Sequence, residues 1–336
     1  MKKYKVIVLV FLAANLLLSC GKPTEPESLY LDATTGDYQI ISIVETHGYA
    51  QDAAFQDDLL YVAQGEGGLM IIDVSDPEKP DILSSVNTNV RGYFTKIIKK
   101  DDAVYLAAGS FGVSVVDVSD PLLPVGTQSN LPMKPARDFH IVNDYLFTSV
   151  SEQGVAIADV SLAMYPEGRG SFNTTGYARG ITATADSAMM MVTCGEVGLS
   201  IFDISDFQQG YGEYPELAIC ETPGYAESIL LLEDKSLACI ACGTAGLQII
   251  DYSDINNVRI VGSYDGSGYA KDLVYKNNTV YMTAETGGLQ IIDIEDPANP
   301  ILIGTIDLEY ALGIVINGNN LYVSGEEEGV IVLSIP

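Results

Sequence analysis

A tyrosine recurs along the chain at one fixed place in a repeating pattern, where it could contribute to a binding surface. The members of this series are Tyr49, Tyr93, Tyr177, Tyr225, Tyr269 and Tyr310. Pro135 takes the same place in one further unit. Phenol rings offer flat faces and hydroxyl groups, which suit sugars and peptides. Alternatively, the rings only wedge between neighbouring units of the fold.

Two positions just downstream of each tyrosine vary from unit to unit, and this zone is rich in charge. The basic residues in and beside it are Arg91, Lys96, Lys134, Arg137, Arg179 and Lys271. Its acidic residues are Asp52, Asp138, Glu227 and Asp272. Cations that converge in a strongly acidic protein could hold an anionic or carboxylate-bearing ligand. Ion pairs within the zone would instead connect the units without any ligand.

Aspartates form a second regular series. They are Asp73, Asp117, Asp159, Asp203, Asp251 and Asp293, with Ser334 in the seventh place. Calcium loops concentrate several oxygen ligands within about a dozen residues, whereas each of these aspartates stands alone just before a turn. We therefore expect structural residues that accept backbone N–H groups, and we predict no metal site. The acidic run Glu326–Glu328 could contribute to a cation site or form a solvated loop.

Four cysteines remain beyond the N-terminal region: Cys194, Cys220, Cys239 and Cys242. Cys239 and Cys242 have a C-x-x-C spacing, but they fall on a predicted strand, where positions three apart face opposite sides. A redox motif needs a helix N-terminus to lower the thiol pKa, so we do not predict one. An even number of cysteines in an exported protein allows a disulfide. Small buried thiols are the alternative.

The elements that must position these residues come from an internal repeat. A glycine precedes a short apolar run seven times, at Gly68, Gly112, Gly154, Gly198, Gly246, Gly288 and Gly329. Successive glycines are 41 to 48 residues apart. In the second unit we predict strands at Tyr93–Lys99, Ala103–Ala108, Val113–Val118 and Val125–Ser129. Four strands in about 43 residues indicate a β-propeller blade.

The two ends of the chain predict how the ring closes. The seventh unit stops after its third strand, Val330–Ser334, while a spare strand, Tyr38–Thr46, lies before the first unit. If the spare strand completes the last blade, every blade has four strands and no sheet is left incomplete. We therefore predict an all-β, seven-bladed propeller over residues 37–336. The first strand of each blade would line the central channel, with the tyrosines around one mouth.

The amino-acid sequence of the repeat resembles that of a known family. The segments Gly68–Pro77 (GLMIIDVSDP) and Gly288–Pro297 (GLQIIDIEDP) resemble the LVIVD repeat. That family comprises bacterial and archaeal surface propellers, many of them lipoproteins. The resemblance covers about residues 48–336 and is weakest in the third and seventh units. It implies the fold, but it carries no established catalytic or binding residues.

The N-terminus reads as a targeting segment. Three lysines precede an apolar run, Val6–Leu18, which is too short to span a bilayer comfortably. The run ends in Leu17-Leu18-Ser19-Cys20-Gly21, which resembles the lipobox of bacterial lipoproteins. The resemblance implies a signal peptide over residues 1–19 and a lipid anchor on Cys20 that holds the protein to a membrane. Residues 20–36 would be a flexible tether, and Gly21 favours an outer-membrane or cell-surface location.

Composition excludes several classes of protein. The chain has 336 residues, 45 of them acidic and 17 basic, for a net charge of −28. This charge argues against nucleic-acid binding, which needs clustered lysine and arginine. With only two histidines, a histidine-based catalytic or metal site has little material. We find no motif for a nucleotide, zinc or nucleophilic serine, and we predict no cofactor.

Two functions remain open. The first is a non-enzymatic, monomeric platform in the cell envelope that binds a protein, peptide or glycan at the channel mouth. The second is a propeller hydrolase or lyase that uses carboxylates at the same mouth. A glycosidase needs two carboxylates at a defined separation, one with a raised pKa. Because the sequence singles out no such pair, we favour the binding function.

Overall fold

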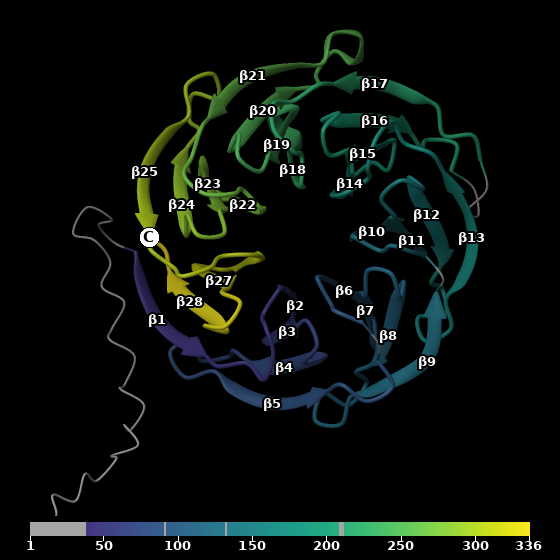
Figure 1. Ribbon diagram of the computed structural model, residues 1–336, viewed down its shortest axis with the longest axis vertical. Helices are drawn as coiled ribbons and strands as arrows, with labels where there is room; N and C mark the ends of the chain where they lie inside the picture. Colours follow the sequence, from purple (N-terminus) through teal and green to yellow (C-terminus); the bar gives the residue numbers. More distant parts are fainter. Residues whose placement is uncertain (1–37, 91, 132, 208–211) are drawn as a thin grey trace, which may run out of the picture. The chain divides into compact units, whose positions relative to one another are not determined.

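The fold is a ring of seven four-stranded antiparallel sheets, as Figure 1 shows. The computed structural model describes residues 38–90, 92–131, 133–207 and 212–336. The predicted seven-bladed β-propeller is therefore confirmed. The predicted signal peptide, the tether, Cys20 and Arg91 lie outside the described residues.

The innermost strand of each blade borders the central channel. In chain order these strands are β2 (Asp52–Gln56), β6 (Lys96–Lys100), β10 (Asp138–Val142), β14 (Ile181–Ala183), β18 (Ser228–Leu232), β22 (Asp272–Lys276) and β26 (Ile314–Asn317). The second strands are β3 (Leu59–Ala63), β7 (Ala103–Ala107), β11 (Tyr145–Ser149), β15 (Met189–Thr193), β19 (Leu237–Ala241), β23 (Thr279–Thr283) and β27 (Asn320–Ser324).

The third strand of each blade ends at the recurring aspartate or at Ser334. These strands are β4 (Leu69–Asp73), β8 (Val113–Asp117), β12 (Val155–Asp159), β16 (Leu199–Asp203), β20 (Leu247–Asp251), β24 (Leu289–Asp293) and β28 (Val330–Ser334). The outer strands are β5 (Asp81–Val86), β9 (Val125–Leu131), β13 (Glu167–Phe172), β17 (Glu216–Cys220), β21 (Arg259–Tyr264), β25 (Ile301–Ile306) and β1 (Gln39–Val44).

Strand β1 closes the ring. It pairs antiparallel with β28, so the last sheet has the order β1-β28-β27-β26. The N-terminal strand thus completes the blade that the C-terminal end of the chain leaves with three strands, as the sequence predicted. This closure leaves each described blade with the same four-stranded pattern.

Helical structure is minor in the described part of the chain. It consists of two short 3-10 turns, η1 (Glu233–Lys235) and η2 (Ile255–Asn257). Within residues 38–336, leaving aside the short gaps, no helix has both the length and the hydropathy to cross a membrane.

The hydrophobic core lies between the blades. The described residues contain seven buried clusters, and each joins two neighbouring blades. One cluster, for example, packs Tyr105 of the second blade against Phe139 and Leu146 of the third. The middle strands are apolar on both faces because a neighbouring blade covers each face. Apolar burial of this kind is the main stabilising term of the fold.

The inner strand of the second blade starts later than predicted. The sequence analysis placed it at Tyr93–Lys99, whereas β6 covers Lys96–Lys100. The reason is that Phe94 pairs instead with Gly65 of the preceding blade, through an isolated bridge. The tyrosine series therefore lies in the segments that enter the inner strands, outside the four-stranded sheets.

The recurring aspartates stabilise turns. Each of the six accepts the backbone N–H group two residues further on, at 2.7 to 2.9 Å. Serine hydrogen bonds lower the pKa of Asp73, and with Arg169 they lower that of Asp159 to about 2. These carboxylates thus serve the structure of the turn that leads to the outer strand.

The four cysteines of the ring are free and buried. Cys239 lies in β19, where burial raises the pKa of its thiol to about 12. The same cause raises the pKa of Cys194 to about 11. Of the two alternatives, the structure shows small buried thiols in a protonated, unreactive form.

Candidate binding site at the channel mouth

Neighbouring blades are connected at the channel mouth by pairs of backbone hydrogen bonds. Each pair joins the loop between the second and third strands of one blade to the residue after the tyrosine position of the next. Ala270 N, for example, donates to Gly243 O at 2.9 Å. Seven such bridges run around the ring, so the loops that carry the mouth are held in place.

Three of the tyrosines cover a glycine of the preceding blade. A Cβ atom on Gly65, Gly195 or Gly243 would lie 2.8 Å from the ring of Tyr93, Tyr225 or Tyr269 respectively. Gly243 also has a φ of 52°, which disfavours other residues. At these places the ring is a wedge between blades, one of the two alternatives left open by the sequence.

Other tyrosines present more of their surface. Tyr49 is 43 % exposed and Tyr177 is 47 % exposed, and both belong to the mouth. Tyr269 and Tyr310 instead donate their hydroxyl groups to Glu227 and Glu285, each at 2.9 Å. The series is therefore divided between packed and exposed rings.

The third blade interrupts the series, because Pro135 stands where the other blades have tyrosine. Its neighbour Gly109 has a φ of 51°, like Gly243, but an added Cβ would have no atom within 4 Å. The ring that would cover this glycine is missing. The mouth consequently lacks this ring at the boundary between the second and third blades.

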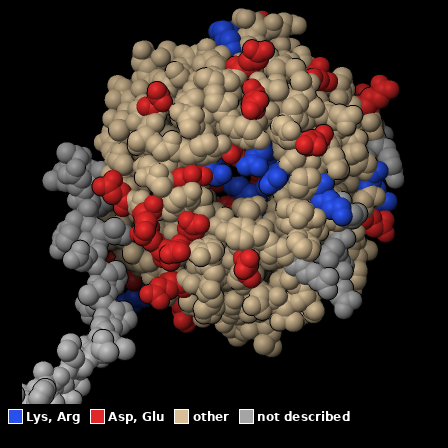
Figure 2. Space-filling model, in the orientation of Figure 1, with Lys and Arg blue, Asp and Glu red and all other residues tan. Residues whose placement is uncertain are grey.

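The variable positions after the tyrosines do converge in space. Every blade contributes at least one of its two variable residues to a cavity of about 150 Å³ in the channel. Figure 2 shows basic side chains within the central opening, while acidic side chains lie on the surface around it. The sequence therefore located the lining of the channel, although not the contacts within it.

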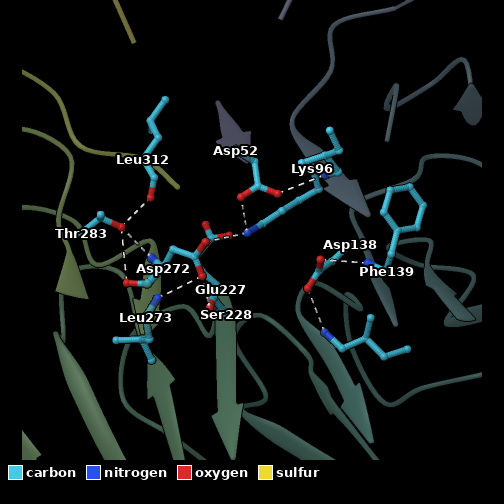
Figure 3. Close-up of polar contacts among 12 residues, drawn as sticks. Asp52, Lys96, Asp138, Phe139, Glu227, Ser228, Asp272, Leu273, Thr283 and Leu312 are labelled. Carbon is cyan, nitrogen blue, oxygen red and sulfur yellow. Dashed lines mark hydrogen bonds and ion pairs between the residues drawn. The ribbon is translucent and has the colours of Figure 1, made fainter. Parts of the chain in front are cut away.

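Lys96 pairs with carboxylates inside the channel. We refer to Lys96, together with Asp52, Asp138 and Asp272, as the floor of the channel. Its Nζ atom lies 2.7 Å from Asp272 Oδ2 and 3.4 Å from Asp52 Oδ1, as Figure 3 shows. The Lys96 side chain is 24 % exposed, and those of Asp52 and Asp272 are only 6 % and 13 % exposed. One lysine thus connects the first, second and sixth blades across the channel.

The carboxylates of the floor also bind the backbone. Asp52 Oδ2 accepts the N–H of Ile97 in the next blade at 3.0 Å. The two oxygens of Asp138 accept the N–H groups of Phe139 and Ile181, at 2.8 and 3.1 Å. Each of these aspartates therefore connects its own blade to the following one.

Burial shifts the protonation of the floor. It raises the pKa of Asp52 to about 7 and that of Asp138 to about 6, although Lys96 opposes both shifts. Burial disfavours the ammonium of Lys96 as well, but Asp272 and Asp52 raise its pKa above the usual value. Asp272 Oδ2, at 2.7 Å, is the closer of the two counterions of Lys96. Asp52, with its raised pKa, is a carboxyl that takes up a proton near neutral pH.

Glu227 holds two further cations. It accepts hydrogen bonds from Arg179 and lies 3.6 Å from Lys271 Nζ. Burial alone would raise the pKa of Glu227, but the opposing effect of Lys271 and Arg179 is larger. The pKa of Glu227 therefore lies below its usual value. The guanidinium of Arg179 also lies over the ring of Tyr225, 5.7 Å from its centroid.

Arg137 differs from the other described cations of the channel. Its Nε atom donates to Ser151 Oγ at 2.9 Å, and no carboxylate of the described residues forms an ion pair with it. Burial and the neighbouring Arg179 lower the pKa of Arg137. A second cavity, of about 350 Å³, opens beside it and is also lined by Arg179, Tyr177 and Tyr225.

The predicted binding residues are thus only partly together. Arg137, Tyr177, Arg179 and Tyr225 line the cavity between the third and fourth blades. Lys271 lines the channel cavity. Tyr49, beside another opening at the first blade, is not among the residues around Arg137. Within the described residues, no group of three histidine, cysteine or acidic side chains is placed to hold a metal ion.

Sequence reasoning missed the hydroxyl groups that position the mouth. Thr193 and Thr283, at the ends of second strands, donate to the carbonyls of Glu227 and Leu312 in the next blade, at 3.1 and 2.5 Å. Ser149 donates to the carbonyl of Arg179 in the same way. The signal was available, since this strand-end place carries alanine in some blades and a hydroxyl residue in others.

Comparisons with known proteins agree with the fold and the repeat type. The profile of the LVIVD repeat matches residues 47–88, 223–266 and 267–307, which confirms the predicted resemblance in the first, fifth and sixth units. No curated protein matches the chain.

Two solved structures illustrate the fold. The computationally designed Ika8 protein, crystallised in P63, aligns with a TM-score of 0.61 and 11 % identity over 88 % of this chain and 99 % of its own. A chain of the mitotic checkpoint complex aligns with a TM-score of 0.68 and 11 % identity over 99 % of both chains. At this identity the similarity concerns the fold alone.

Proposed function

From a closed ring that carries LVIVD repeats, we propose that this protein is a non-enzymatic binding protein of the cell envelope. A lipid on Cys20 anchors it to the membrane, and residues 20–36 tether the ring. The channel mouth presents the ligand site. Propellers serve many functions on one scaffold, so the proposal rests on the mouth and not on the fold.

The observation that carries the proposal is the cavity between the third and fourth blades. It has a volume of about 350 Å³, a size within the range of ligand pockets, and Pro135, which stands in place of a tyrosine, is part of its lining. Arg137, which has no carboxylate partner among the described residues, borders that cavity. Features that only build blades recur in every blade, whereas this cavity brings together, among the described residues, Pro135 in place of a tyrosine and an arginine without a carboxylate partner.

The carboxyls of the channel support binding rather than catalysis. Asp52 and Asp138 have the raised pKa values that a general acid needs. However, Asp52 is buried between Lys96 and the Ile97 N–H, and both oxygens of Asp138 already accept backbone N–H groups. Their hydrogen bonds are used to connect blades, which leaves the hydrolase or lyase as the weaker alternative.

Binding and turnover can be separated in one experiment. The full chain, held in detergent micelles, is applied to arrays of glycans and peptides, and bound ligands are recovered and analysed by mass spectrometry. We expect at least one ligand to be retained without chemical change. Turnover of any ligand that is lost in an Asp138→Asn or Asp52→Asn variant would overturn the proposal in favour of the enzyme.

The anchor has its own test. Cells that express the protein are fed an alkyne-labelled fatty acid, and the purified chain is examined for label. We expect label in the wild-type protein and none in the Cys20→Ala variant. An unlabelled wild-type protein, or equal label in both, would contradict the lipid anchor while leaving the ligand site untouched.

A further inference from the structure

The opening between the third and fourth blades has a composition that selects among ligands. Its cavity is lined by charged and polar side chains, among them Arg137, Ser151, Glu152 and Gln153, together with the ring of Tyr177. The apolar surface of this lining consists of Pro135 and the rings of Tyr177 and Tyr225. The composition favours a small polar ligand with one flat face.

The charge of the site favours a single negative group. Arg179 and Lys271 are already neutralised by Glu227 and, for Lys271, also by Glu285 at 3.9 Å. Arg137 uses Nε for Ser151, which leaves its two terminal amino groups for a ligand. A guanidinium binds a carboxylate with two parallel hydrogen bonds. The exposed Glu152 beside it disfavours a doubly charged phosphate.

The aromatic ring supplies the second element of recognition. Tyr177 is 47 % exposed and lies at the same cavity. Tyr225 is less available, because the Arg179 guanidinium covers its face. An exposed phenol ring packs against the apolar face of a sugar, while Gln153 can bond hydroxyl groups.

The backbone at this boundary does not offer an edge for an extended peptide. Ala136 and Ala178 donate to Gly109 and Ser151 of the preceding blades, at 3.0 Å each. Arg137 N and Arg179 N donate to second-strand carbonyls of their own blades, at 2.9 and 2.8 Å. Peptides that bind by strand addition need unpaired backbone groups. A sugar needs none.

Building on the proposed binding function, we propose that this opening binds a uronic acid residue of an acidic glycan. The carboxylate lies on Arg137, and the sugar ring packs on Tyr177. Gln153 and Glu152 bond the hydroxyl groups. The site therefore distinguishes a carboxylated sugar from its neutral counterpart by Arg137, which forms no ion pair with a carboxylate of the described residues.

The test compares matched sugars on matched variants by calorimetry. Trigalacturonate, neutral trigalactose and a peptide with a free C-terminal carboxylate are titrated into the full chain in detergent. We expect trigalacturonate to bind at least about 10-fold tighter than trigalactose. Arg137→Gln should weaken its binding about 10- to 100-fold, the loss of a charged two-point contact. Arg137→Lys should retain only part of the affinity.

A control and three outcomes make the test decisive. Arg259→Gln removes an exposed arginine of the outer strand β21 that pairs with Asp251, and should leave binding unchanged. Equal affinity for both sugars, or an unaffected Arg137→Gln variant, would overturn the inference. If trigalactose or the peptide binds at least as tightly as trigalacturonate, and Tyr177→Ala abolishes that binding, the proposed binding function stands but the uronate proposal is overturned. If none of the three ligands binds, the uronate proposal is overturned. If the glycan and peptide arrays also retain no ligand, the proposed binding function is overturned as well.

Discussion

Two cations of the same channel, Lys96 and Arg137, have opposite surroundings. Lys96 lies among carboxylates from across the ring, 2.7 Å from Asp272 and 3.4 Å from Asp52. The side chain of Arg137 has a hydrogen bond only to Ser151 among the described residues, and it borders an opening. This difference shows that a basic residue in a propeller channel does not by its position alone indicate a ligand site. What matters is whether the ring supplies the counterion.

Replacing the two cations should separate these roles. Lys96→Met leaves Asp52, Asp138 and Asp272 in the channel without a counterion, and we expect a loss of about 3 kcal/mol in the free energy of unfolding. Arg137→Met removes a charge that has no carboxylate partner and lies near Arg179, so its cost should stay below about 1 kcal/mol. Urea denaturation of both variants measures the difference. Equal losses in the free energy of unfolding would contradict the distinction between the paired Lys96 and Arg137, which has no carboxylate partner among the described residues.

The protonation of the floor sharpens the comparison. Burial raises the pKa values of Asp52 and Asp138 to about 7 and about 6, above the unfolded value of roughly 3.9. The folded state therefore binds more protons, and the stability from these groups falls as pH rises from about 4 to about 7. The slope is at most about 1.4 kcal/mol per pH unit for each carboxyl. Asp52→Asn should flatten it.

Glu227 provides the matched control with the opposite sign. Its pKa is lowered by Lys271 and Arg179 despite its burial. Its contribution to stability is therefore present above the unfolded pKa and is lost only as pH falls below about 4. Denaturation midpoints of Glu227→Gln should differ from wild type by a constant amount between pH 5 and 7. If Glu227→Gln instead flattened the pH dependence of stability between pH 5 and 7, the assignment of this titration to Asp52 and Asp138 would be wrong.

Two glycines test whether the missing tyrosine opens the mouth. Gly243 and Gly109 share a positive φ, but only at Gly243 would a Cβ meet a tyrosine ring, at 2.8 Å from Tyr269. Gly109→Ala should cost about 1 kcal/mol, from the backbone alone. Gly243→Ala should cost about 1 to 3 kcal/mol more, because the ring must shift. Thermal unfolding of the pair measures this difference, and equal shifts would show that both places are equally filled.

The repeat made most of the fold predictable. Spaced glycines and aspartates identified seven units, and the spare strand before Tyr49 identified the closure by β1. The start of β6 was misplaced by three residues, because Phe94 pairs with a neighbouring blade. Local sequence does not specify such a contact, since it depends on where the next blade lies.

The site was predictable in location but not in detail. The variable pairs after the tyrosines do line the channel, as their place at the start of the inner strands implied. The sequence could not tell that Lys96 reaches Asp272, which is 176 residues away, or that Glu227 serves two cations. Side chains on facing strands choose partners by distance across the channel. Only the structure shows that Arg137 has no carboxylate partner among the described residues.

The most direct measurement of the central claim observes the arginines themselves. Nitrogen-15 spectra of the arginine Nε–H groups are recorded while trigalacturonate is added to the full chain in detergent. The account predicts saturable shifts at Arg137 and Arg179, with Arg169 and Arg259 on the outer strands unchanged. Unchanged Arg137 and Arg179 signals at saturating trigalacturonate, or equal shifts at all four arginines, would contradict it.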